Sequence, residues 1–112
     1  MIHNEAETIR AALGAIEGVQ HVTRGWPKRL ECLQCIAVTK AADTPVDFRD
    51  DRAHLAELEY YVRVFADSAQ QADAIAVLAD AAMEALGYTR TFSYDDDDGR
   101  VRIAAMRYRK YV

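Results

Sequence analysis

Apolar residues near the start of the chain follow the spacing of an amphipathic helix. Between Ile9 and Ile16 they recur every three or four positions, which predicts a helix over residues 4–18. Asn4 is a favoured N-cap residue, and Gly18 is a favoured residue at the end of a helix. We therefore expect this helix to bury one side against the rest of the protein.

Three later segments alternate apolar and polar residues as β-strands do. The strongest alternation runs from Leu55 to about Ala66. Its core-facing positions are Leu58, Tyr60, Val62 and Val64. Residues 33–39 predict a second strand, and residues 20–23 predict a short strand or an extended connection. A sheet with one face in the core follows from this alternation.

A polar segment separates two of these strands. Residues 40–52 are mostly polar and include Pro45, Asp47, Asp50 and Asp51. This composition predicts a long loop, and a loop of that length inside a small domain is more often functional than a passive connection. We therefore expect the segment to be available for contacts.

The clearest helix is predicted over residues 69–86. Ser68 can cap its N-terminus, and Gly87 is placed to end it. Its apolar face is mostly alanine and comprises Ala72, Ile75, Ala76, Ala79, Ala82, Met83 and Leu86. Because small side chains let a helix approach its partner closely, we expect this helix to pack on the sheet.

The last part of the chain predicts a β-hairpin. Strands over residues 88–94 and 101–112 flank an Asp-Gly pair at 98–99, which is a hairpin-turn sequence. The expected acidic tip consists of Asp95, Asp96, Asp97 and Asp98. Alternation breaks at residues 104–105, which indicates either a β-bulge or a strand buried on both faces.

The order of these elements predicts the fold class. Helix, strands, helix and a closing hairpin give the order α-β-β-β-α-β-β. We expect an α+β fold in which two helices pack on one face of a mainly antiparallel β-sheet. No repeat or linker divides the chain, so residues 1–112 are expected to form a single domain.

Composition and charge narrow the class of protein. The chain is 51% hydrophobic with a net charge of −4, and 20 of its residues are alanine. All 18 acidic residues precede Gly99, whereas the residues from Gly99 onward carry five basic side chains. This split is not that of a uniformly basic nucleic-acid binder. No apolar run could span a bilayer and no signal-peptide pattern is present, so we expect a cytoplasmic protein without membrane contact.

Catalytic and metal-binding spacings are missing from the sequence. The glycines form no phosphate-binding loop, and no nucleophile shares a segment with an acid or base. We therefore expect no enzyme, no catalytic residue and no cofactor. Cys32 and Cys35 have C-x-x-C spacing, but a strand would point them to opposite faces, so a metal site is not expected. The aspartate run lacks an EF-hand pattern and is better explained as a solvated tip.

The basic closing strand has two interpretations. Alternation places Arg107, Arg109 and Tyr111 on one face and Arg102 on the other. Arginines with interleaved tyrosines could stack on and neutralise a nucleic acid. Alternatively, they could pair with glutamates on the neighbouring strand or with another subunit. Because the acidic body repels phosphates, the second interpretation is favoured and no specific nucleic-acid binding is expected.

Three linked segments resemble the tail-completion proteins (tail terminators and minor tail proteins) of long-tailed bacteriophages and prophages. They are the aromatic-rich strand EYYVRVFA at 59–66, the alanine-rich helix after Ser68 that ends in MEALGY at 83–88, and the closing strand IAAMRYR at 103–109. The first half is similar in element order, with an amphipathic helix, a Trp-Pro break and a strand. The resemblance covers nearly the whole chain.

The resemblance implies a structural assembly protein. Family members are α+β sandwiches that form a homo-oligomeric ring, often a hexamer, although an isolated chain can be a monomer. The ring caps the tail tube and meets the head connector, so the tail-tube and head-connector proteins are the implied partners. The implied location is the host cytoplasm during assembly and the virion tail afterwards.

The ring that the resemblance implies suggests roles for the charged residues. Intersubunit or partner contacts are predicted at Arg100, Arg102, Arg107, Arg109, Asp47, Asp50 and Asp51. The run from Asp95 to Asp98 is predicted to face the pore, where it would repel DNA phosphates and ease DNA transit. Two alternatives remain. One is a small ligand-binding or regulatory α+β domain that dimerises through an edge strand, and the other is a toxin-like or nuclease domain that uses the carboxylates and a metal.

Overall fold

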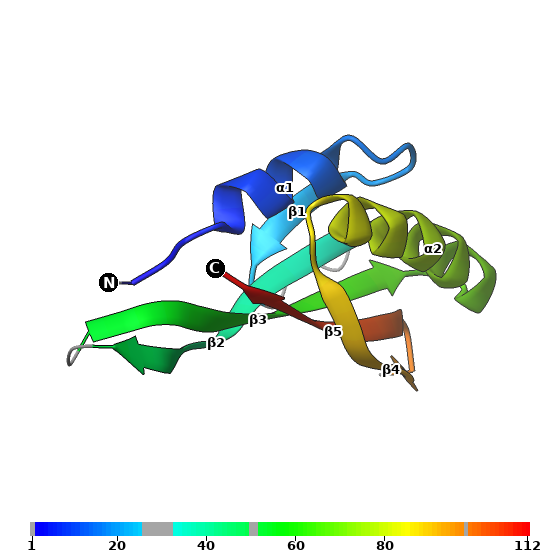
Figure 1. Ribbon diagram of the computed structural model, residues 1–112. Helices are drawn as coiled ribbons and strands as arrows, with labels where there is room; N and C mark the ends of the chain where they lie inside the picture. Colours follow the sequence, from blue (N-terminus) through cyan, green and yellow to red (C-terminus); the bar gives the residue numbers. More distant parts are fainter. Residues whose placement is uncertain (1, 26–32, 50–51, 98) are drawn as a thin grey trace.

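Helices and strands follow one another in the order that the sequence predicts. The computed structural model describes residues 2–25, 33–49, 52–97 and 99–112, with the backbone alone for residues 47–49 and 52–54. The elements (Figure 1) are α1 (Ala6–Gly14), β1 (His21–Arg24), β2 (Cys35–Arg49), β3 (Arg52–Ala66), α2 (Ala69–Ala85), β4 (Thr89–Asp97) and β5 (Arg102–Tyr111). The predicted α+β class and element order are confirmed.

The five strands form one mixed sheet in the order β1-β2-β3-β5-β4. β1 pairs with β2 in parallel, and the other three neighbouring pairs are antiparallel. Both helices lie on the same side of this sheet (Figure 1), as the sequence predicts. Beneath them lies one core to which the largest contributors are Ile9, Leu13, Ile36, Leu58, Tyr60, Val62, Val64, Met83 and Tyr108.

α2 forms where the sequence predicts it. Its N-cap residue Ser68 is extended, and the Ser68 hydroxyl accepts a hydrogen bond of 3.2 Å from the backbone N–H of Gln71. The buried side of the helix consists of Ala72, Ile75, Ala79 and Met83. Gly87 follows the helix with a φ of +91°, a conformation that strongly favours glycine, so the chain can turn back into β4.

α1 is shorter than the periodicity predicts. It ends at Gly14, and Gly18 instead takes a positive φ in the turns that lead to β1. The N-cap residue is Glu5 rather than the predicted Asn4, although the side-chain oxygen of Asn4 accepts a hydrogen bond of 3.1 Å from the N–H of Ala6. Ile16 packs against the core from outside the helix, so its apolar spacing reflects burial rather than helix length.

The long loop predicted over residues 40–52 is wrong, because β2 runs to Arg49 and β3 starts at Arg52. The two strands continue past the helices as a two-stranded ribbon (Figure 1). The register of their pairing shifts beside Lys40 and again beside Pro45, so the pattern of alternation is interrupted there. Pro45 is tolerated because β1 pairs with β2 only at the other end of that strand, which leaves Pro45 on an open edge.

The closing hairpin is confirmed, but its acidic tip is not a loop. β4 extends through Asp97, and Asp95, Asp96 and Asp97 pair with β5; Asp98 lies outside the described residues. Residues 104–105 form no bulge and are buried on both faces, which is the second of the two predicted explanations. The register shift lies instead in β4, between Arg90 and Phe92.

Candidate functional site

The face of the sheet opposite the helices has a buried end and an open part. At the buried end, Cys35, Ala37, Phe65, Val101 and Ile103 form a small second core against which Leu33 packs. The open part carries Tyr61, Arg63, Phe92, Tyr94 and Arg107, which we call the aromatic–arginine face. The strand register builds it, because Tyr61 and Phe92 both pair with Arg107 of β5.

Aromatic rings and guanidinium groups contact one another across this face. The Tyr61 and Phe92 rings meet edge-to-face with centroids 6.4 Å apart, and Phe92 stacks on Tyr94 at 6.0 Å. The Arg63 guanidinium lies 4.6 Å from the centroid of Tyr61. Arg107 lies 5.5 Å from Tyr61 and 5.9 Å from Phe92. Each such contact contributes about 0.5–1 kcal/mol at an exposed site, so the cluster is pre-ordered.

This face leaves large aromatic side chains in contact with solvent. Phe92 is 42% exposed and Tyr94 is 46% exposed, whereas Tyr60 and Tyr108 on the helix side are almost fully buried. Exposed large apolar side chains that gather in one patch, rather than singly, mark a surface that binds something. Aromatic residues and arginine are also the residue types enriched in protein–protein interfaces.

Electrostatics on the face are close to balanced. Arg107 forms an ion pair with Glu59, whose side chain is only 15% exposed. A hydrogen bond from Arg107 lowers the pKa of the Glu59 carboxyl, and the same bond raises the pKa of Arg107. Both groups are therefore charged at neutral pH. The Nε of Arg107 is buried and donates to no acceptor among the described residues.

The predicted contact arginines do not share one surface. Arg107 and Arg109 lie on the open side of β5, and the Arg109 guanidinium is 5.6 Å from the ring of Tyr111. Arg102 lies on the helix side, where it forms an ion pair with Asp97. Arg100 is exposed just before β5. The alternation along β5 predicted this division between the two faces.

The predicted acidic contacts are also divided. Asp47 lies on β2 in the projecting ribbon, whereas Asp50 and Asp51 lie outside the described residues. In β4, Asp95 pairs with Ala104 and lies on the helix side, whereas Asp96 pairs with Ile103 on the opposite side. The run therefore cannot present all of its carboxylates to one pore or one ion.

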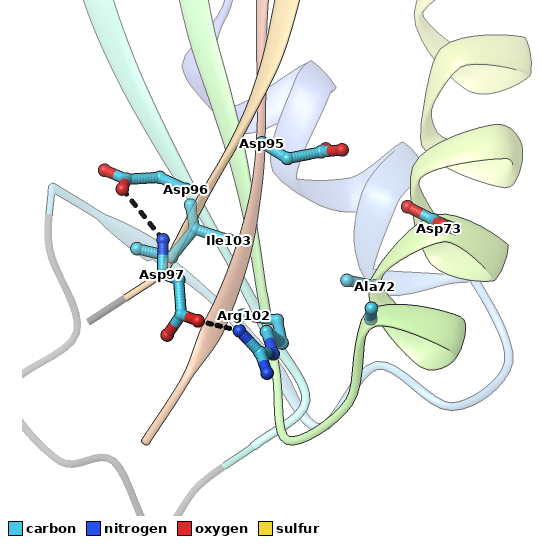
Figure 2. A pocket seen from close by; sticks show the side chains of 8 residues that line it. Ala72, Asp73, Asp95, Asp96, Asp97, Arg102 and Ile103 are labelled. Atoms are coloured by element: carbon cyan, nitrogen blue, oxygen red, sulfur yellow. Dashed lines mark hydrogen bonds and ion pairs between the residues drawn. The ribbon is translucent and has the colours of Figure 1, made fainter. Parts of the chain in front are cut away.

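A hollow of about 350 Å³ lies between the start of α2 and the paired end of β4 and β5. Figure 2 shows the carboxylates of Asp73 and Asp95 pointing toward one another across it, with Arg102 held by Asp97 below. A second hollow of about 310 Å³ shares Asp73 and Asp95 and continues along α2. No group of three or more potential metal ligands gathers among the described residues. Cys35 is buried in the second core, and Cys32 lies outside the described part.

Sequence reasoning found one part of the aromatic–arginine face and missed the other. The alternation on the closing strand placed Arg107 correctly. Because Tyr60 and Val62 face the core, the same alternation places Tyr61 on the outer side of its strand, but nothing in the sequence assigns a function to Tyr61, Phe92 or Tyr94. The i, i+2 spacing of Phe92 and Tyr94 on a strand was the available signal, because it puts two aromatic rings on one face.

No family model matches the chain, and no curated protein matches it. In the part of the chain that the structure describes, no helix combines the length and the apolar character needed to cross a membrane. The aromatic–arginine face provides aromatic surfaces, guanidinium donors and a carboxylate paired with Arg107.

Proposed function

We propose that this chain is a structural assembly protein of the kind it resembles, a phage or prophage tail-completion protein. Copies would form a ring that caps the tail tube and joins it to the head, first in the host cytoplasm and then in the virion tail. The observation that carries the proposal is the sheet whose helices cover one face while the other presents exposed, pre-ordered aromatic and arginine side chains. Such a surface is suited to a protein partner.

The charge on the face favours a protein partner over a nucleic acid. Glu57 and Glu59 lie on β3 beside the arginines, and Asp96 lies on the same side of β4. Arg107 already neutralises Glu59 through a direct ion pair. A surface that draws its affinity from phosphates needs uncompensated positive charge, which this face does not provide. We assign the face to the end of the tail tube, whose subunits the resemblance names as partners.

The β2–β3 ribbon supports an assembly role. The pairing of β3 with β5 ends at Glu57 and Tyr111, and two backbone hydrogen bonds of 2.9 Å follow between Ala56 and Val112. The rest of the ribbon lies past the end of β5. A two-stranded ribbon is only marginally stable alone, so it gains most by packing on a neighbour. Contacts through Asp47, Asp50 and Asp51 stay predictions. A pore-lining role stays a prediction for the aspartates on one face of β4 at a time, which are Asp95 and Asp97 on the helix side or Asp96 on the other.

The test is complementation: a phage or prophage that encodes this chain loses its own copy, and a variant is supplied in its place. A variant with Tyr61→Ala, Phe92→Ala and Tyr94→Ala should fold, yet it should give tails of irregular length and few joined heads by electron microscopy. Leu78→Ala is the matched control, because Leu78 is 49% exposed on α2 and lies away from the face. Normal tails and full infectivity with the triple variant would contradict the proposal.

A further inference from the structure

We propose that copies of this chain join edge to edge, with β1 of one copy extending the sheet of the next beside β4. The inference rests on the proposed ring and names the interface that would build it. In the sheet order β1-β2-β3-β5-β4, the described strands leave one side of β1 and one side of β4 without a partner strand. All nine residues of β4 are exposed. Unpaired strand edges of this kind are sites of strand addition.

The helix layer leaves room for a neighbour above β4. α1 packs over β1 and β2, and α2 packs mainly over β3 and β5. The two adjoining hollows lie where β4 emerges beside α2, and their shared residues are Asp73 and Asp95. A second copy placed beside β4 would bring its own α1 next to α2. Both the sheet and the helix layer would then continue across the interface.

Charge complementarity indicates that the β4 edge meets the β1 edge of another copy. Asp73 of α2 and Asp95 of β4 point toward one another (Figure 2), and the described residues provide neither with an ion pair. β1 ends in Arg24, which is exposed and pairs with Val38 of the helix-side core. Arg24 also has no ion pair within the described residues. Alongside β4 of the next copy, it would lie on the same side of the sheet as the two carboxylates.

The acidic residues also determine which edges can meet. Two β4 strands paired with each other would leave both β1 edges open and would bring no Arg24 to Asp73 and Asp95. A β4 edge that meets a β1 edge instead places Arg24 on the same face of the sheet as the aspartates. That contact uses different surfaces on the two copies, so it repeats head-to-tail and closes into a ring when the rotation allows.

Charge reversal tests the pairing through native mass spectrometry of the full-length chain over a concentration series. A chain with Asp73→Lys and Asp95→Lys, or a chain with Arg24→Glu, should each associate at least ~10-fold more weakly than wild type, because like charges then face each other. Mixed in equal amounts, the two variants should associate again with alternating composition. In that mixture every interface carries opposite charges. Glu84→Lys on the exposed surface of α2 is the control and should leave association unchanged.

Three results would overturn the edge-to-edge inference. The first is that the mixture of the two variants does not associate. The second is that Arg24→Glu leaves association unchanged. The third is that the wild-type chain stays monomeric at the highest concentration it tolerates. Each of these is distinguishable from failure of the proposed function, which depends on the aromatic–arginine face. Loss of tail completion through Tyr61, Phe92 and Tyr94 with no effect of the edge variants would retain the function and remove this interface.

Discussion

Two adjacent tyrosines on β3 separate what stabilises this protein from what it presents to partners. Tyr60 points to the helix side and is fully buried, its ring meets Tyr88 edge-to-face at 6.0 Å, and its hydroxyl accepts a hydrogen bond of 3.1 Å from the N–H of Glu5. Tyr61 points the other way and remains partly exposed among arginines. The same residue type is thus part of the core on one face and part of a binding surface on the other.

The polar groups of the two faces also differ in how many of their hydrogen bonds are made within the chain. On the helix side, the hydroxyl of Tyr88 donates to Glu5 at 2.7 Å and Lys110 donates to the same carboxylate at 3.1 Å. Burial alone would raise the pKa of Glu5, but these two hydrogen bonds lower it. On the open side, Arg107 keeps a buried Nε–H without an acceptor among the described residues. On the helix side Glu5 is thus held by two donors from distant parts of the chain, whereas on the open side Arg107 retains a donor for a partner.

The largest expected effect is the difference in unfolding free energy between two single variants, one at each of these neighbouring tyrosines. Tyr60→Ala should lower the free energy of unfolding by about 3–5 kcal/mol, because it empties a large buried volume. Tyr61→Ala should cost about 1 kcal/mol or less, since it removes only partly solvated contacts. Denaturant unfolding monitored by circular dichroism measures both. Equal losses for the two variants would show that the open side is also a structural core.

A smaller effect is expected from deleting one hydroxyl on each side of the sheet. The Tyr108 hydroxyl donates to Asp80 at 2.7 Å, and burial, followed by this hydrogen bond, raises the pKa of Tyr108. Tyr108→Phe should therefore cost about 1 kcal/mol of unfolding free energy. Tyr111→Phe, at a side chain that is 52% exposed, should change it by less than about 0.5 kcal/mol. Indistinguishable unfolding midpoints would mean that the Tyr108 hydroxyl is satisfied by solvent in the wild-type chain.

The smallest effect should show in the pH dependence of stability. The backbone N–H of His3 donates to Asp43 at 2.7 Å and, with Lys40, lowers the pKa of that carboxyl from 3.8 to about 2. Because the unfolded chain binds this proton more tightly, the contribution of Asp43 is present above pH ~4 and is lost as the pH falls toward ~2. Asp43→Asn should flatten this part of the profile in thermal melts.

Glu59→Gln, on the open side, should flatten the part just below pH ~4.5, because Arg107 lowers the pKa of Glu59. If neither substitution changed the dependence of stability on pH, other carboxyl groups would be responsible for the loss of stability in acid.

Local signals in the sequence were sufficient where one physical cause acts alone. The alternation from Leu58 to Val64 marks the buried side of β3, because the side chains of a strand point to opposite faces in turn. Ser68 capped its helix as predicted, since an N-cap requires only the local backbone. The polar segment at 40–52 misled, because Thr44, Pro45 and Val46 are exposed yet lie in a strand whose pairing does not depend on apolar alternation.

The sequence by itself determined the order of the helices and strands and which side of β3 and β5 is buried, because periodicity and capping act over a few residues. Only the tertiary structure decided that β5 lies between β3 and β4. That placement brings Tyr61 and Phe92 together around Arg107, and it leaves β4 as an open edge beside Asp73. Strand order depends on packing between segments far apart in the chain, and no local pattern of residues encodes it.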